Sequence, residues 1–147
     1  MKAKGFELPD QNGKSRKLSD YLGKWLVLFF YPKDFSPGCT TQVCSYRDFI
    51  GEIRAKGAEV LGVSMDTVDS HSQFYEQHHL NFDILSDPQG NVVKDYGILN
   101  TTGKFPYAKR TTYLIDPAGE IVKTYENVDP TKDARNIVAD LGTLIKK

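Results

Sequence analysis

A run of seven consecutive apolar residues, Trp25 to Tyr31, limits most strongly what this chain can fold into. A strand that is apolar at every position is typical of the centre of a sheet that is covered on both faces. Pro32 and Pro37 then interrupt regular structure, and from Gly38 onward the residues fit a helix. The run therefore predicts a buried central strand, a short loop and a helix in succession.

Strand and helix patterns alternate along the rest of the chain, which indicates a three-layer α/β domain. The turn signal Asn12-Gly13 predicts a small N-terminal hairpin. We expect strands at 60–63, 82–85, 111–115 and 120–125, helices at 36–57, 67–80 (capped by Asp66 or Asp69), 87–96 (opened by Asp87-Pro88) and 129–145 (opened by Asp129-Pro130), and a loop at 100–109. This pattern fits several α/β arrangements.

Length and charge narrow the class of protein. The 147 residues suit one domain, 1–147, with a single core, and 19 basic residues balance 19 acidic ones, which favours neither nucleic acid nor an anionic membrane as a partner. No run approaches membrane-spanning length, and the first residues lack the apolar core of a signal peptide, so we expect a cytoplasmic protein. Two cysteines in such a chain favour redox or ligand chemistry over a disulfide scaffold.

Both cysteines lie in the helix that follows the apolar run. Ser36 suits the N-cap and Pro37 suits the first helical position, which places Cys39 in the first turn. Unpaired backbone N–H groups and the positive end of the helix dipole favour an anion there, and the thiolate is the reactive form of cysteine. Sulfur chemistry at Cys39 is therefore the leading hypothesis.

The spacing of the two cysteines adds a conformational constraint. Cys39 and Cys44 are five residues apart, which corresponds to a Cα separation of roughly 8.5 Å in an intact helix. A disulfide needs less than about 7 Å, so a bridge can close only after the first turns unwind. Such a bridge would be strained and readily reduced.

The residues around Cys39 resemble a known family. Pro32-x-x-x-Ser36-x-x-Cys39 is similar to the active-site signature of peroxiredoxins, and the longer stretch 31–48 resembles the peroxiredoxin Q subfamily, also called bacterioferritin comigratory proteins. Segments 6–13, 60–64, 85–87 and 110–116 follow in the family's order. Ser36 replaces the usual Thr but keeps its hydroxyl, whereas Gln42 stands where Glu is frequent and removes a charge near Cys39.

This resemblance implies a thioredoxin-like fold with an extra N-terminal hairpin, no cofactor, and most often a monomer. It implies that Cys39 attacks a hydroperoxide to form a sulfenic acid, that Cys44 resolves it as a disulfide, and that thioredoxin or a similar dithiol reopens the bridge. Arg110 matches the family's catalytic arginine. Ser36 would hydrogen-bond the peroxide, and Pro32 would shield the thiolate from water.

Other interpretations remain open at several positions. The two thiols could serve a disulfide oxidoreductase or a redox sensor, although the absence of Cys-x-x-Cys disfavours the former. A helix cap alone would explain Ser36. Three aromatic residues, Tyr31, Phe35 and Tyr46, fit core packing better than a substrate channel. Three histidines, His71, His78 and His79, lie on a polar segment without metal-ligand spacing, so we expect no metal site.

Overall fold

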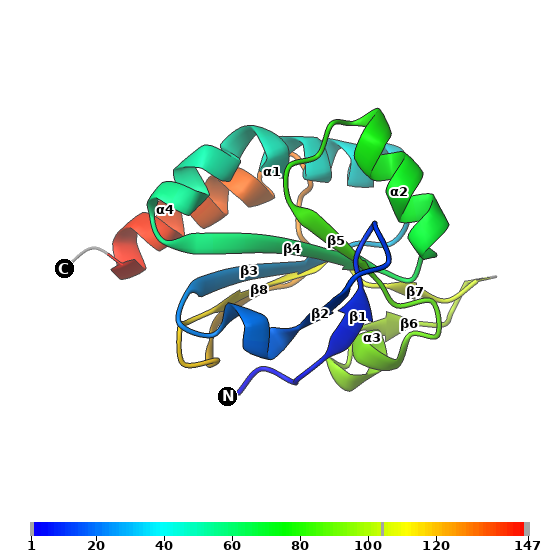
Figure 1. The fold of residues 1–147 in the computed structure, drawn as a ribbon, viewed down its shortest axis with the longest axis horizontal. Helices are drawn as coiled ribbons and strands as arrows, with labels where there is room; N and C mark the ends of the chain where they lie inside the picture. Colours follow the sequence, from blue (N-terminus) through cyan, green and yellow to red (C-terminus); the bar gives the residue numbers. More distant parts are fainter. Residues whose placement is uncertain (1, 104, 146–147) are drawn as a thin grey trace.

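A five-stranded sheet forms the centre of the computed structural model, which describes residues 2–103 and 105–145 (Figure 1). The strand order is β5-β4-β3-β8-β9. Their bounds are Trp25–Phe30 for β3, Ala58–Ser64 for β4, Asp83–Ser86 for β5, Thr111–Ile115 for β8 and Ile121–Tyr125 for β9. β3 pairs in parallel with β4 and antiparallel with β8, which confirms the prediction that the apolar run lies in the middle of a sheet.

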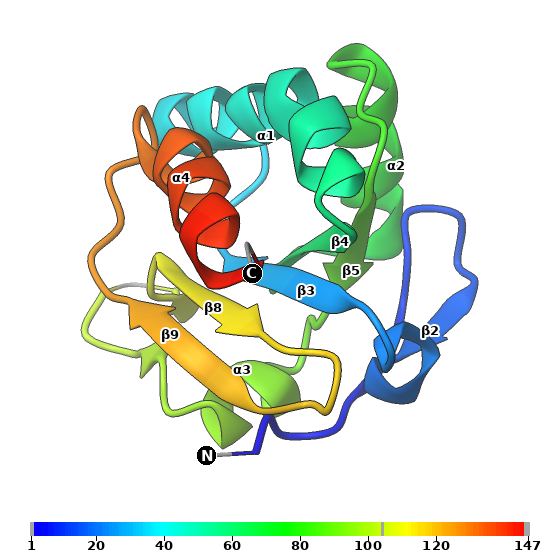
Figure 2. The same cartoon turned by 90° about the vertical axis from the view of Figure 1, so that its left-hand side faces the viewer.

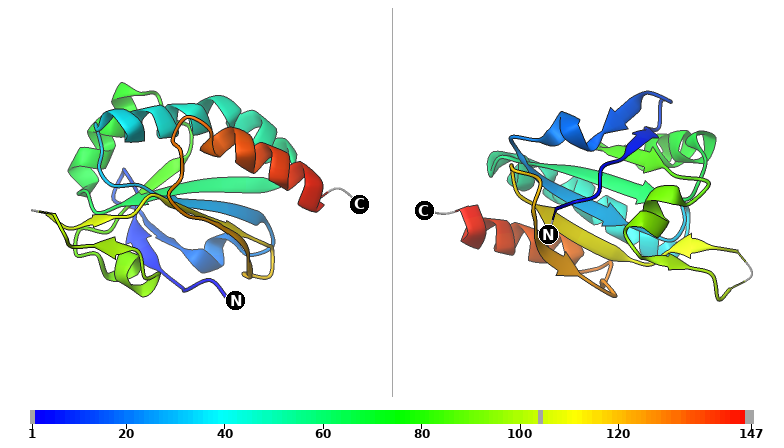
Figure 3. Two further views of the ribbon diagram at one scale, coloured as in Figure 1. Left: turned by 180° about the vertical axis from the view of Figure 1, so that it is seen from behind. Right: turned by 90° about the horizontal axis from the view of Figure 1, so that it is seen from below.

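Helices and a hairpin cover the two faces of this sheet (Figure 2). On one face lie α1 (Pro37–Ala55), α2 (Val68–Gln77) and α4 (Asp133–Ile145), with α1 and α4 running along each other when seen from behind (Figure 3). The opposite face carries α3 (Asn91–Asp95), the short 3-10 helix Leu18–Tyr21 and the hairpin of β1 (Glu7–Pro9) and β2 (Ser15–Lys17). The three layers and the N-terminal hairpin match the prediction.

The alternation of side chains along β3 explains why both faces must be covered. Val27 and Phe29 belong to the apolar cluster beneath α1 and α4, whereas Leu26, Leu28 and Phe30 belong to the cluster on the hairpin side. All five side chains are buried. A strand that is apolar at every position is stable only between two apolar layers, because either face would otherwise lie in water.

Two helices start later than the sequence pattern predicts, and in both cases an aspartate forms a turn first. The carboxylate of Asp129 accepts hydrogen bonds from the backbone and hydroxyl of Thr131, so α4 begins only at Asp133. The carboxylate of Asp87 accepts the N–H of Val93, and Gly90, with a φ of 73°, occupies the N-cap of α3. An aspartate followed by proline therefore marks the turn before each helix.

Two further predictions are corrected. The cap of α2 is Thr67, whose hydroxyl accepts the N–H of Ser70, and neither predicted aspartate takes this role. The segment expected to be a loop contains a small antiparallel ladder between β6 (Leu99–Asn100) and β7 (Tyr107–Ala108). Such a short pair depends on tertiary contacts, which the local sequence does not report.

The length and polarity of the helices bear on whether one of them could span a membrane. α1 has 19 residues, among them polar and charged ones. Within the part of the chain that the structure describes, no helix is both long and apolar enough to cross a bilayer.

Gly62 provides a test of the packing between the sheet and the helices. A Cβ atom at this position of β4 would lie 2.9 Å from Cζ of Phe29 and 3.1 Å from Cγ2 of Ile84, both buried. We therefore expect Gly62→Ala to lower the free energy of unfolding by about 1–3 kcal/mol, measured by urea denaturation. Gly51→Ala on the exposed side of α1 is the control, because a Cβ there meets nothing within 4 Å. It should raise stability by up to about 1 kcal/mol, and a loss equal to that of Gly62→Ala would contradict the packing argument.

Candidate active site

The loop between β3 and α1 is fixed by the side chain of Asp34, which is almost completely buried. Its Oδ1 accepts a hydrogen bond from the hydroxyl of Tyr31 at 2.7 Å, and its Oδ2 accepts one from Ser70 Oγ at 2.8 Å. The backbone N–H of Asp34 donates to a carboxylate oxygen of Asp66 at 2.8 Å. These contacts tie the loop to the end of β4 and to the start of α2.

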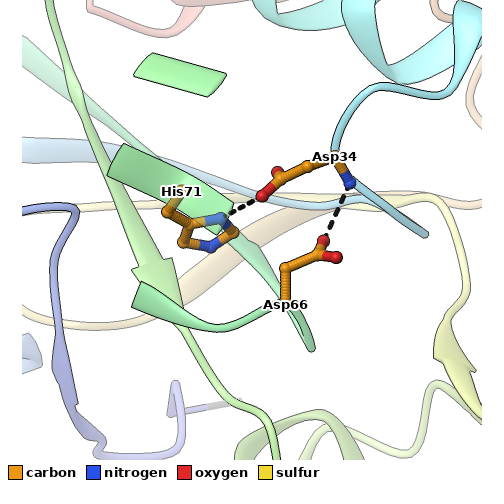
Figure 4. Close-up of side chains that lie close together, drawn as sticks. All are labelled: Asp34, Asp66 and His71. Atoms are coloured by element: carbon orange, nitrogen blue, oxygen red, sulfur yellow. Dashed lines mark hydrogen bonds and ion pairs between the residues drawn. The ribbon is translucent and has the colours of Figure 1, made fainter. Parts of the chain in front are cut away.

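His71 completes this cluster from α2 (Figure 4). Its Nδ1 lies 2.6 Å from Asp34 Oδ2, and its Nε2 lies 2.8 Å from the carbonyl oxygen of Leu85. The two ring nitrogens therefore face a carboxylate oxygen and a carbonyl oxygen, which hold the ring between the loop and β5. His71 lies on the predicted polar segment, but its own side chain is fully buried.

Asp34, Asp66 and His71 have ligand atoms close enough to one another to surround a metal ion. The atoms that face one another already have protein partners, however. Asp66 Oδ2, for example, accepts both the N–H of Asp34 and the hydroxyl of Ser64, at 2.8 and 2.6 Å. This donor set therefore fits a hydrogen-bonded lock on the loop better than it fits a metal centre.

Phe35, the residue after Asp34, has a strained backbone. Its φ of 67° lies in the left-handed region, which costs a residue other than glycine on the order of 1–3 kcal/mol. Its ring is 45% exposed and contacts Phe74 edge-on, with 5.0 Å between the ring centroids. Tyr31 and Tyr46, in contrast, are fully buried in the core, so of the three aromatic residues only Phe35 is open to solvent.

Ser36 marks the start of α1 but does not cap it with its side chain. Its extended backbone and the bond from Thr40 N–H to its carbonyl at 2.9 Å place it at the N-cap. The predicted N-cap at Ser36 is therefore confirmed, although its hydroxyl donates to the carbonyl of Lys33 at 2.8 Å and accepts no backbone N–H of the helix. Cys39 is the third residue of the helix, where the backbone N–H has no acceptor within the helix, and its side chain is fully buried.

Arg110 joins this helix start through a chain of polar side chains. Its Nη1 donates to Gln42 Oε1 at 2.7 Å, and Gln42 Nε2 donates to Asp133 Oδ2 at 3.1 Å. The same carboxylate oxygen accepts the hydroxyls of Tyr46 at 2.5 Å and Thr112 at 2.8 Å. One buried oxygen therefore connects α4, α1 and β8. The amide of Gln42, which is oriented by its bond to this oxygen, in turn fixes the position of the Arg110 guanidinium.

The electrostatics of this chain explain why a neutral side chain at position 42 suits the site. Burial raises the pKa of the Asp133 carboxyl, while the hydrogen bonds from Tyr46, Thr112 and Gln42 and the charge of Arg110 act against this shift. A glutamate at position 42 would place a second carboxylate against Asp133. An amide instead donates to Asp133 and accepts from Arg110, so both neighbours are satisfied.

Gly38 lets the guanidinium of Arg110 lie against the first turn of α1. A Cβ atom at position 38 would be only 3.0 Å from Arg110 Nη2. Gly38 directly precedes Cys39, so the positive charge lies beside the turn that carries the buried thiol. A guanidinium in this position has N–H groups that can donate hydrogen bonds to an oxygen of a bound molecule.

The structure brings most of the predicted site residues together. Pro32 and Ser36 flank the locked loop, Cys39 follows in the first turn, and Arg110 lies against that turn. Cys44 is on the same helix, half-buried, with its Sγ 3.8 Å from Nδ1 of His78, the C-cap residue of α2. Both cysteines are free thiols.

Sequence reasoning missed the two buried aspartates that organise the site. Asp133 lies 91 residues from Gln42, and Asp34 lies 37 residues from His71. In the sequence, Asp133 occurs among other polar residues, and neither aspartate has a distinguishing spacing from its partners. The only local signal is that Asp34 lies in the short loop after the buried strand, two residues beyond Pro32.

A buried cysteine in the first turn of a helix, with an arginine against that turn, defines a thiol-based redox protein. The model of the AhpC/TSA family matches residues 1–124. Peroxiredoxin Bcp of Bacillus subtilis is 37% identical over 149 residues, covering 97% of this chain and 95% of that protein. Chloroplastic peroxiredoxin Q of Triticum aestivum is 42% identical over 123 residues, which are 83% of this chain and 56% of that protein.

Solved structures give the same result. Peroxidoxin BcpB from Mycobacterium tuberculosis has a TM-score of 0.92 and 34% identity, covering 98% of this chain and 96% of that one. The bacterioferritin comigratory protein of Xanthomonas campestris, described for its alkyl peroxide reduction activity, has a TM-score of 0.90 and 30% identity over 96% of this chain and 92% of that one. The chain therefore belongs to the AhpC/TSA family, as a peroxiredoxin of the Bcp and peroxiredoxin Q group, and the predicted thioredoxin-like fold is confirmed.

The buried carboxyl of Asp133 predicts a specific pH dependence of stability. Burial raises the pKa of the Asp133 carboxyl above the value of about 3.9 expected in the unfolded chain, so the folded protein binds the carboxyl proton more tightly than the unfolded chain does. The contribution of Asp133 to stability is therefore lost as the pH rises through the folded-state pKa. Relative to Asp133→Asn, the wild-type protein should gain stability as the pH is lowered from about 7 to about 4, measured by urea denaturation.

Asp129→Asn is the matched control because hydrogen bonds from Thr131 lower the pKa of the Asp129 carboxyl. The sign is then opposite, and the wild-type protein should lose stability relative to this variant over the same range. Equal slopes for the two variants would contradict the assigned role of burial at Asp133.

Proposed function

We propose that this protein, a thiol-dependent peroxidase by family, reduces hydrogen peroxide and organic hydroperoxides with Cys39 as the attacking residue. The observation that carries the proposal is the position of Cys39 in the first turn of α1, buried and next to the glycine against which Arg110 lies. The described alkyl peroxide reduction of the Xanthomonas campestris relative supports organic hydroperoxides as substrates.

The chemistry begins with the thiolate of Cys39. It attacks the terminal peroxide oxygen, the O–O bond breaks, and water or an alcohol leaves after protonation, so that the sulfur becomes a sulfenic acid. Negative charge builds up on the leaving oxygen in the transition state. Fixed hydrogen-bond donors that bind this oxygen more strongly in the transition state than in the ground state lower the barrier. Arg110 is the donor to the leaving oxygen in this proposal. The hydroxyl of Ser36, whose hydrogen donates to Lys33, accepts a hydrogen bond from the peroxide, and Pro32 shields the thiolate from water.

Cys44 resolves the sulfenic acid by forming a disulfide with Cys39. α1 runs without interruption through both residues, which in helical geometry keeps their Cα atoms roughly 8.5 Å apart. The bridge therefore requires the first turns of α1 to unwind, which releases Gln42 from Asp133. The ring of Tyr46 stacks on Phe29 at 4.5 Å and anchors the following turn, so that unwinding ends near Cys44.

An external dithiol then reopens the bridge, and thioredoxin is the reductant in this proposal. Unwinding supports this step, because it would expose both sulfurs to a partner.

A cytoplasmic location suits a cycle that depends on a reductant, since thiols are kept reduced there. We further propose that the chain acts as a monomer with one domain, since α1 carries both cysteines.

Substitution of each cysteine separates the two roles. Cys39→Ser should abolish peroxide consumption coupled to thioredoxin, thioredoxin reductase and NADPH, because the attacking sulfur is gone. Cys44→Ser should still form one sulfenic acid per chain, detected by mass spectrometry after dimedone trapping, but should not be recycled by thioredoxin. Full thioredoxin-linked turnover in Cys44→Ser would show that the assigned resolving role is wrong.

Gly38→Ala tests the role of Arg110 without changing Arg110 itself. The added Cβ would lie 3.0 Å from Nη2, so the guanidinium must move by a few tenths of an ångström. We expect the rate constant of Cys39 oxidation by hydrogen peroxide to fall by about tenfold, or about 1.4 kcal/mol, in stopped-flow measurements.

Stability should not fall in the same way, because alanine forms helices better than glycine. Gly51→Ala, on the same helix and away from the site, should leave the oxidation rate unchanged. An unchanged rate in Gly38→Ala would remove the argument that the position of Arg110 matters.

A further inference from the structure

The second cysteine of α1 has a basic neighbour that the mechanism above does not use. Sγ of Cys44 lies 3.8 Å from Nδ1 of His78, within hydrogen-bonding range for sulfur. The two residues come from different helices, because Cys44 is on α1 and His78 directly follows α2 at its C-cap. The contact is therefore created by the packing of α2 against α1.

Two contacts hold His78 in this position, one to its backbone and one to its ring. The carbonyl oxygen of His78 accepts a hydrogen bond from Arg47 Nη1 at 2.7 Å, which clamps its backbone to α1. Its ring packs edge-on against Phe74, with 5.1 Å between the ring centroids. The Arg47 clamp involves main-chain atoms of His78, so it is kept when the side chain is changed.

The surroundings of Cys44 make a base useful there. Burial raises the pKa of its thiol, the charge of Arg47 acts against this shift, and Asp48, which pairs with Arg47 at 3.1 Å, adds to it. A thiol in this state is mostly protonated at neutral pH, and a protonated thiol does not attack a sulfenic acid. An imidazole accepts a proton between about pH 5 and 8, which suits this task.

We propose that His78 is the general base that deprotonates Cys44 for its attack on the oxidised Cys39, an inference that rests on the proposed function. The proton of Sγ passes to Nδ1, and the electron pair left on Cys44 forms the S–S bond to Cys39. The S–O bond of the sulfenic acid breaks, and the hydroxide takes up a proton as His78 releases one to solvent. One thiol and one sulfenic acid become one disulfide and one water, with Cys44 oxidised and Cys39 reduced.

The reactivity of Cys44 alone tests this assignment. In Cys39→Ser, Cys44 is the one thiol left in the chain, and its alkylation by iodoacetamide can be followed from about pH 5 to 9. His78→Gln in the same background should react about tenfold more slowly at neutral pH, because the neighbouring base is gone. This factor is below the usual range for a positioned base because the contact is long.

His79→Gln is the matched control, because His79 is exposed and directly follows His78. It should leave the pH profile of alkylation unchanged. His78→Asn provides a second variant, and circular dichroism of each checks that the helices are retained. If His78→Gln and His78→Asn give the same profile as His79→Gln, the inference is overturned.

The intact protein separates this inference from the proposed function. After one equivalent of hydrogen peroxide, His78→Gln should oxidise Cys39 at the normal rate but close the disulfide about tenfold more slowly. If Cys44→Ser turns over with thioredoxin, the resolving role itself fails. If Cys44→Ser is blocked while the histidine variants show unchanged Cys44 alkylation, only the role of His78 fails.

Discussion

The buried carboxylate of Asp133 is the interaction on which the arrangement of the site depends. One of its oxygens accepts hydrogen bonds from Gln42, Tyr46 and Thr112, and so joins α4 to α1 and to β8. Gln42 in turn orients Arg110 against the first turn of α1. A buried carboxylate is tolerated only when its lone pairs are satisfied, so Asp133 fixes the three donor side chains and, through Gln42, also Arg110.

Two such anchors enclose the segment in which the chemistry takes place. Asp34 fixes the loop before α1, while Tyr46, bound to Asp133 and stacked on Phe29, fixes the helix beyond Cys44. The segment between them contains both cysteines. Local opening of a protein follows its weakest region, so anchors on both sides would confine the proposed unwinding step to the turns that carry the sulfurs. The strained backbone of Phe35 is held in place by the same loop anchor.

Much of the fold follows from local patterns. The apolar run predicted β3 at the centre of the sheet, the Asn12-Gly13 turn predicted the hairpin, and the motif around Cys39 predicted the start of α1. Some of the differences from the predicted pattern have a common cause, because side chains that form turns with nearby backbone compete with helix formation. Asp129 delays α4 in this way, and the hydroxyl of Ser36 bonds back to the loop instead of capping α1.

The sequence by itself determined that Cys39 and Cys44 lie on one helix, with Cys39 in its first turn, because these positions depend on local spacing alone. Only the tertiary structure decided what surrounds them. The partners of Gln42, Asp34 and Cys44 lie 91, 37 and 34 residues away along the chain. Polar contacts of this kind leave no periodicity in a sequence, because each depends on how whole elements pack and not on the residues beside it.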